Sequence, residues 1–228
     1  IGLRSGFCAD QSCSSTPDSA VHVFMNIALC SSCWKRKGPA QIYVPINVTI
    51  LALIIAILQY LAQKCSVADH WFPADLQQRA RVSEYLSWQH LNLRLHCSKV
   101  TMLRVGIDFM LTLPRPGRPT KLSNRGIRSL DLLEEKFLQN KQFIIGSKIS
   151  LADLVAIVEM MRPLAVGVDV FKDRPKLLAW RDRVKKELGE KLFDQAHEAV
   201  LNPSDMQQKM PNNSEMQKFK SALSRYFR

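Results

Sequence analysis

One stretch of the chain carries most of the information about its fold, Phe143-Ile-Ile-Gly-Ser-Lys-Ile-Ser-Leu-Ala-Asp-Leu154. It contains a complete signal for the start of a helix. Ser150 stands at the N-cap position, where its hydroxyl can accept the backbone N–H of Asp153, and the Asp153 carboxylate can reach back to the N–H of Ser150. Ile149 and Leu154 flank this pair as the two partners of a hydrophobic staple. We therefore predict a structural capping box made by Ser150 and Asp153.

The helix that follows this box is apolar on nearly every side. Its sequence reads Leu154-Val-Ala-Ile-Val158 and continues with Met160 and Met161. Because a helix that is hydrophobic all round lies inside a domain, its cap must find partners in the protein instead of in water. Helical periodicity extends from residue 74 onward, with the first helix expected directly after Pro73, and it is interrupted by the proline-rich loop 114–119. Asp173 is the expected cap of a later helix that has Pro175 in its first turn. The sequence therefore predicts a mainly α fold, an all-α bundle.

Further segments resemble the C-terminal domain of theta-class glutathione transferases, in the same order and at similar spacing. They are Trp71-Phe-Pro-Ala-Asp-Leu-Gln-Gln-Arg-Ala-Arg-Val-Ser-Glu-Tyr-Leu-Ser-Trp-Gln-His90, Glu134-Glu-Lys-Phe-Leu-Gln-Asn-Lys141, Arg174-Pro-Lys-Leu-Leu-Ala-Trp-Arg181 and Leu192-Phe-Asp-Gln-Ala-His-Glu-Ala-Val200. The capped helix is similar to the buried central helix of that domain. The resemblance runs from residue 68 to residue 228. It implies a glutathione transferase C-terminal helical bundle, preceded by a degenerate or incomplete thioredoxin-like α/β segment.

The beginning of the chain fits the family less well. It shows no clean alternation of strands and helices. We therefore expect residues 1–68 to be a divergent or degenerate thioredoxin-like region and residues 69–228 to be the all-α domain. The chain also begins with Ile instead of Met, as expected of a fragment or of a gene model with an incorrect 5′ end.

A long uncharged stretch, residues 42–62, lies near the end of this region. It is long enough to span a bilayer, but Pro45, Asn47 and Gln59 weaken that interpretation. We favour a buried strand followed by a core helix, and a membrane partner is not expected.

The resemblance also implies a set of site residues. Theta enzymes stabilise the glutathione thiolate with a Ser hydroxyl, and the family pattern around that residue is similar to Ser15-Thr-Pro-Asp-Ser-Ala-Val-His-Val-Phe24, which makes Ser15 the candidate catalytic residue. A Ser-rich loop that matches by chance is the alternative. Val44 and Pro45 correspond to the cis-proline dipeptide that binds the glutathione backbone. Arg94 corresponds to an arginine that faces the active-site cleft, where it can pair with the glutathione carboxylate or polarise a leaving group; the alternative is an exposed helix arginine.

One expected part of the glutathione site is missing. In the family a Glu-Ser pair opens a helix that binds the γ-glutamyl carboxylate, and Leu53 and Ile54 stand at those positions here. Neither side chain can form a hydrogen bond, and each lost bond to a charged group is worth about 1.5–3 kcal/mol. This favours a second hypothesis, a catalytically silent helical module that acts in protein interaction.

The charge and the cysteines exclude other classes of function. The net charge is +12, but the basic residues interleave with acidic ones and no recognition motif accompanies them, so we expect no nucleic-acid partner. Cys30 and Cys33 form a CxxC pair that could be redox-active, or could join Cys8 and Cys13 in a zinc site. Neither use fits the rest of the chain, and we expect no metal and no cofactor other than glutathione as co-substrate.

The leading hypothesis from the resemblance is a transferase that conjugates the glutathione thiolate to small electrophiles such as halides, epoxides or peroxides. The family implies a cytoplasmic homodimer whose subunits pack partly through the first helices of the bundle, near Arg79 and Arg81.

Overall fold

A computed structural model describes residues 48–65, 67–101 and 121–201, and within these ranges the regular structure is entirely helical. The α-helices are α2 (Val48–Lys64), α3 (Leu76–Gln89), α5 (Asn124–Leu132), α6 (Leu151–Leu164), α7 (Pro175–Leu188) and α8 (Glu190–Leu201). A short 3-10 turn, η1 (Asp69–Trp71), precedes α3, and π-helical turns η2 (His90–Arg94) and η3 (Leu133–Leu138) extend α3 and α5. The prediction of a mainly α fold is confirmed.

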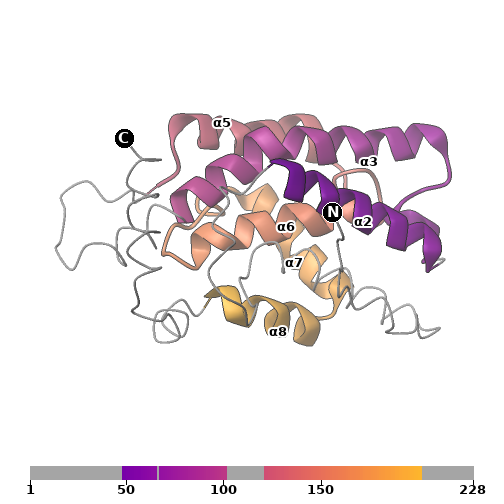
Figure 1. The fold of residues 1–228 in the computed structure, drawn as a ribbon. Coiled ribbons are helices and arrows are strands. Elements are labelled where there is room, and N and C mark those ends of the chain that lie inside the picture. Colours follow the sequence, from indigo (N-terminus) through magenta and orange to yellow (C-terminus); the bar gives the residue numbers. More distant parts are fainter. Residues whose placement is uncertain (1–47, 66, 102–120, 202–228) are drawn as a thin grey trace, which may run out of the picture.

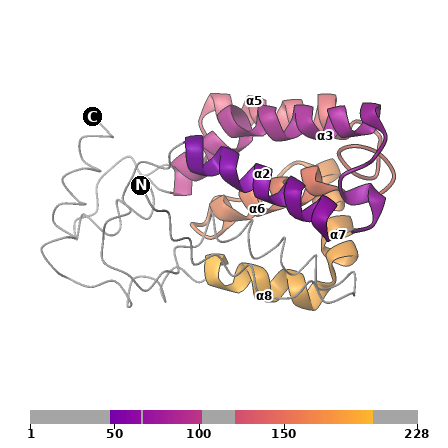
Figure 2. The same ribbon diagram turned by 45° about the vertical axis from the view of Figure 1, so that its right-hand side comes forward.

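Helix α6 lies at the centre of the bundle. In Figures 1 and 2, α3 and α5 run side by side on one side of α6, and α8 lies on the opposite side. Helix α6 contacts α3, η2, α7 and α8. All of its residues from Leu151 to Pro163 are buried, as predicted for the apolar central helix. Pro163 occupies the last turn, and the helix ends one residue later.

The start of α6 is tied to two other parts of the bundle by one carboxylate. Ser150 and Asp153 form a capping box, in which Asp153 Oδ2 accepts the Ser150 backbone N–H at 3.0 Å and the Ser150 hydroxyl at 2.9 Å. The other oxygen accepts the backbone N–H of Ile144 at 2.8 Å and the Trp180 indole N–H at 2.9 Å. The cap of the buried helix therefore finds its partners inside the protein, and it connects α6 to the preceding loop and to α7.

The start of α3 lies slightly later than the sequence suggested. We expected the helix to begin directly after Pro73, whereas the N-cap residue is Asp75. Its side chain accepts the backbone N–H of Gln78 at 2.8 Å. A carboxylate at the N-cap satisfies a helix N–H that would otherwise lack a partner, so Asp75 sets the boundary.

The predicted cap of α7 is wrong by one residue. The sequence suggested Asp173, but the N-cap is Arg174, and Asp173 lies one position earlier with a φ of 61°. Because Pro175 occupies the first helical position and has no N–H, one fewer backbone donor needs a cap. Arg174 instead uses its side chain, which pairs with Asp131 and Glu134 and connects α7 to α5 and η3.

The second half of the uncharged stretch forms the core helix that we predicted. Within α2, Leu58 and Ala62 are buried in the same hydrophobic core as α3 and α6. Residues 42–47, where we expected a strand, lie outside the described ranges. No helix among the described residues is both long enough and apolar enough to cross a membrane.

Candidate functional site

Only one of the predicted binding or catalytic residues lies in the described part of the chain. Ser15, Val44 and Pro45 fall outside it, so their roles remain predictions. Arg94 lies in η2, at the end of α3.

The π-helical turn η2 directs Arg94 into the protein. A π turn holds one more residue than an α turn, which changes the direction in which the following side chains point, and such turns are frequent at functional sites. Leu91 is 68% exposed, whereas Leu93 and Arg94 are buried. The alternative interpretation of Arg94, an exposed helix arginine, is therefore wrong. Its role in ligand binding stays a prediction.

Inside the bundle, Arg94 shares one carboxylate with a second arginine. Arg94 Nη1 lies 3.2 Å from Glu159 Oε1, and Arg162 Nη1 lies 3.1 Å from Glu159 Oε2. The Arg162 guanidinium also donates to the Ser98 hydroxyl at 2.7 Å. The exposed fractions of the three charged side chains are only 4%, 1% and 9%. We call Arg94, Glu159 and Arg162 the arginine cluster; two guanidiniums and one carboxylate give it a net charge of +1.

Several polar atoms beside the arginine cluster are buried without a partner. Among the described residues these are Tyr85 Oη, Gln89 Oε1 and Arg94 Nη2, all on α3 and η2, and a fourth such atom is His197 Nε2 on α8. An unsatisfied buried polar atom costs about 1–3 kcal/mol, and native proteins hold few of them. Three of the four lie on α3 and η2, so hydrogen-bonding capacity is left unused on this stretch of the chain.

The electrostatics of this region suit anion binding better than acid–base catalysis. Burial lowers the pKa of Arg94, Glu159 acts in the opposite direction, and Arg162 lowers that pKa further. Burial also lowers the pKa of His90, so this imidazole is neutral near pH 7. Burial raises the pKa of Tyr85 well above its usual value, as it does for the Cys97 thiol. The phenol therefore stays protonated, and the buried thiol is not a nucleophile.

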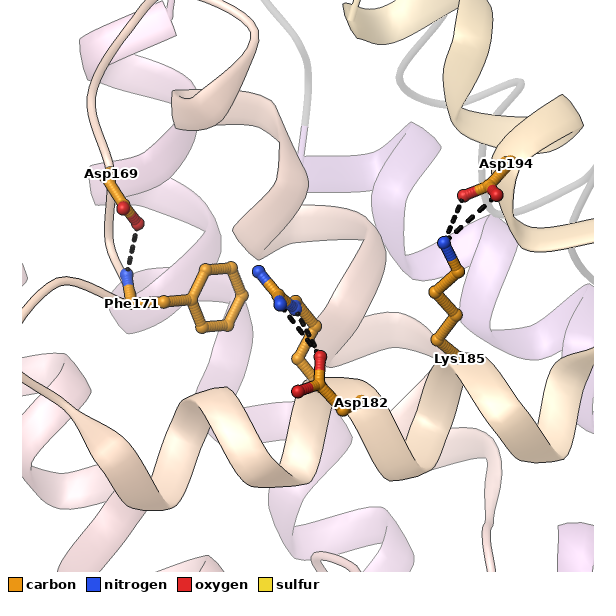
Figure 3. A network of polar contacts seen from close by, with 6 residues as sticks. Asp169, Phe171, Asp182, Lys185 and Asp194 are labelled. Atoms are coloured by element: carbon orange, nitrogen blue, oxygen red, sulfur yellow. Dashed lines mark hydrogen bonds and ion pairs between the residues drawn. The ribbon is translucent and has the colours of Figure 1, made fainter. Parts of the chain in front are cut away.

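The charged residues on α7 contrast with this cluster. Figure 3 shows the Lys185 side chain pointing toward Asp194. Lys185 Nζ lies 2.7 and 3.0 Å from the two carboxylate oxygens of Asp194. Arg181 pairs with Asp182, and its guanidinium lies over the Phe171 ring. These pairs are more exposed to solvent, and exposed ion pairs contribute about 0–1 kcal/mol. Lys185 and Arg181 each have a carboxylate of their own, so these two pairs lack the unbalanced positive charge of the arginine cluster.

A separate hollow lies between the loop after η3 and α7. Its volume is about 450 Å³, and it is lined by Leu138, Gln139, Asn140, Lys141, Gln142, Pro175, Lys176, Ala179 and Arg183. It includes no member of the arginine cluster. In the described ranges, no group of three or more His, Cys, Asp or Glu side chains is arranged to hold a metal ion.

The sequence interpretation missed Glu159 and Arg162. Both are charged residues, three positions apart, in a helix that is otherwise buried and almost wholly apolar. A charge in such a helix needs a partner, so this spacing was the available signal.

Comparisons with known proteins agree with the fold. The family model described as "Glutathione S-transferase, C-terminal domain" matches residues 106–187. The chain is 49% identical to glutathione S-transferase theta-1 of Gallus gallus over 157 residues, which are 68% of this chain and 60% of that protein. It is 48% identical to glutathione S-transferase theta-3 of Mus musculus over 161 residues, 69% of this chain and 66% of that protein. The matched segment thus spans 60% and 66% of the length of these two curated relatives.

Solved structures extend the comparison. The apo form of human glutathione-S-transferase T1-1 matches with a TM-score of 0.64 and 32% identity, covering 91% of this chain and 95% of that one. Human glutathione transferase theta-2, in complex with glutathione and an unknown ligand, matches with a TM-score of 0.66 and 28% identity, covering 91% and 94%. The helical bundle is thus that of a glutathione transferase. This chain belongs to the theta class of the glutathione S-transferase family.

Proposed function

We propose that this protein is a glutathione transferase that binds glutathione and joins its thiolate to a small electrophile. The observation that supports this best is the arginine cluster. It has a net positive charge, it is shielded from water, and Arg94 Nη2 is free to donate a hydrogen bond. Glutathione offers two carboxylates and a thiolate, and a guanidinium in a low-dielectric site attracts such groups strongly. The related theta-2 enzyme has been solved with glutathione bound.

The proposed chemistry is nucleophilic attack by the thiolate. Ser15 would donate a hydrogen bond to the sulfur, which lowers the thiol pKa and makes the nucleophile available near neutral pH. Val44 and Pro45 would bind the glutathione backbone. With a halide, the sulfur–carbon bond forms as the carbon–halogen bond breaks and the halide ion leaves. With an epoxide, the ring carbon–oxygen bond breaks and the oxygen takes a proton. Organic peroxides are the third proposed class.

The proposed assembly is a cytoplasmic homodimer. Arg79 and Arg81 were the residues expected near the contact. Arg79 stabilises its own helix start, because its Nε donates to the Pro73 carbonyl at 2.7 Å and its guanidinium lies over the Phe72 ring. Arg81 is exposed and has no such contact among the described residues, so it is the better candidate for an intersubunit contact. Analytical ultracentrifugation of wild type and Arg81→Glu tests this, with a shift toward monomer expected in the variant.

The proposed activity is tested by calorimetric titration with glutathione, followed by turnover assays with a halide, an epoxide and a peroxide. We expect a dissociation constant between micromolar and millimolar, and turnover that falls in Ser15→Ala. Thr16→Ala, a change of the neighbouring hydroxyl, is the matched control and should keep its activity. A folded helical protein that does not bind glutathione would contradict the proposal and would favour the catalytically silent interaction module, in line with Leu53 and Ile54.

A further inference from the structure

The charge balance of the arginine cluster depends on Arg162. The pair of Arg94 and Glu159 taken alone is neutral, and a neutral ion pair attracts an anion only weakly. Arg162 binds the second oxygen of the same carboxylate, so that one negative charge is shared between two positive ones. The excess charge therefore exists only while Arg162 is present and protonated.

Among the residues that the structure describes, no other charged group pairs with the arginine cluster and cancels its excess charge. Tyr85 and Cys97 are buried and neutral, and His90 is neutral near pH 7 because burial and Arg94 both lower its pKa. The charged groups that shift the pKa of Arg94 are Glu159 and Arg162, and Asp153, the other buried carboxylate of α6, is bonded to Ile144, Ser150 and Trp180 instead of to either arginine. Within the described residues, Glu159 is the sole carboxylate that pairs with Arg94 or Arg162.

Hydrogen-bond geometry gives the two arginines different tasks. One guanidinium nitrogen of Arg162 contacts both Ser98 and Glu159, at 2.7 and 3.1 Å, which holds that side chain in place between the helix that follows η2 and α6. Arg94 uses Nη1 for Glu159 and keeps Nη2 unpaired. Arg94 is thus the group that can contact a ligand, and Arg162 acts through Glu159.

We infer that Arg162 is a positioning residue that makes the Arg94–Glu159 pair net positive, so that Arg162 and Glu159 together set the affinity of Arg94 for an anion. This inference rests on the proposed function in one respect, which is that glutathione supplies the anion. The ligand chemistry is a carboxylate, thiolate or sulfate-like group that accepts a hydrogen bond from Arg94 Nη2. Because the site is shielded from water, one unit of charge changes the affinity on the order of tenfold.

The test uses inorganic sulfate as the probe and the full chain. The arginine side-chain ¹⁵N resonances are followed during a sulfate titration at constant ionic strength, with the Arg94 signal assigned by its loss in Arg94→Met. We expect Arg162→Met to bind sulfate about tenfold more weakly, and Arg162→Lys to recover most of the affinity, because it restores the charge. Glu159→Gln should bind about tenfold more tightly, because the cluster then has a net charge of +2.

Two control variants distinguish the effect of charge at the arginine cluster from effects of local packing and from sulfate binding elsewhere on the protein. Ser98→Ala removes the Arg162 anchor but no charge, and its affinity should stay within about twofold of wild type. Lys176→Gln removes a cation from the hollow beside α7, and it should not change the Arg94 shift. A merely structural role for Arg162 predicts weaker binding in both Arg162→Met and Glu159→Gln, so the opposite signs are decisive. If Glu159→Gln does not fold, the comparison of Arg162→Met with Arg162→Lys decides the question alone.

Two results would overturn the inference: sulfate that does not perturb Arg94, or equal affinities in wild type, Arg162→Met and Arg162→Lys. A parallel titration with glutathione keeps the two proposals apart. If sulfate binds with the expected order of affinities and glutathione does not bind, the proposed function fails while the inference stands. If glutathione binds but substitution of Arg162 changes the affinity for neither ligand, the inference fails while the proposed function stands.

Discussion

Helix α6 carries two buried acidic residues six positions apart, and the protein treats them in opposite ways. Asp153 accepts four hydrogen bonds from neutral donors, at 2.8 to 3.0 Å, so its capacity is fully used. Glu159 faces two guanidiniums, and Arg94 keeps one nitrogen without a partner. A completely satisfied polar group serves the fold, whereas an incompletely satisfied one costs stability and is retained where function needs it. We interpret the contrast as one between a folding element and the proposed ligand site within one helix.

The largest effect is expected at the Asp153 cap. Asp153→Ala removes the acceptor for the Ile144 N–H and for the Trp180 indole, and it deletes the capping box at Ser150. Because these buried donors then lack partners, we expect the free energy of unfolding to fall by about 3–5 kcal/mol, measured by urea denaturation. Asp153→Asn keeps the side-chain shape and should lose less. A cost under about 1 kcal/mol for Asp153→Ala would remove the distinction between the two acids.

Removing Arg94, one of the two partners of Glu159, should change ligand binding more than it changes folding stability. In Arg94→Met, Glu159 keeps Arg162 as its partner, so we expect a stability change below about 1.5 kcal/mol. The affinity for glutathione should fall about tenfold, because the net charge and the free donor are lost together. Urea denaturation and calorimetry measure the two effects. Arg128→Met, an exposed arginine on α5, is the control, and unchanged glutathione affinity in Arg94→Met would contradict the account.

His197 on α8 also has a buried atom without a partner, and it makes the free energy of unfolding depend on pH. His197 donates from Nδ1 to the Phe193 carbonyl, and its Nε2 is buried without a partner. Burial lowers the pKa of His197, although the Phe193 carbonyl and Asp194 act in the opposite direction. The unfolded chain therefore binds the proton more readily, so this stability is intact above about pH 6.5 and is lost as the pH falls below it.

Unfolding curves between pH 5 and pH 8 measure this contribution. His197→Leu should flatten the dependence, by at most about 1.4 kcal/mol per pH unit, which is the limit for one proton. Identical slopes in the variant and the wild type would show that His197 is not responsible.

The smallest effect belongs to the exposed cap. Asp75 caps α3 at the surface with one hydrogen bond to the Gln78 N–H. Asp75→Ala should cost about 0.5–1 kcal/mol, because water can replace the lost acceptor. Differential scanning calorimetry would detect the shift in melting temperature. A loss equal to that of Asp153→Ala would mean that burial does not account for the difference between the two caps.

The sequence was most informative where the interaction is local. Ser150 and Asp153 are three residues apart, and a capping box needs only a hydroxyl and a carboxyl side chain at that spacing, so the box could be predicted. The burial of Arg94 could not be predicted, because its partner Glu159 is distant in the sequence and because η2 changes the direction of the Arg94 side chain. Asp173 was chosen as a cap by residue type, yet the backbone at that position has a positive φ, which no pattern of side chains reveals.

We propose that Arg94, held by Glu159, is a ligand-binding group and more than a structural ion pair. A crystal structure of the full chain with glutathione tests it most directly. We expect an anionic group of the ligand within about 2.7–3.2 Å of Arg94 Nη2, with Nη1 still on Glu159 and Arg162 still on the second carboxylate oxygen. Glutathione bound elsewhere, with Arg94 Nη2 in contact with protein atoms only, would contradict it.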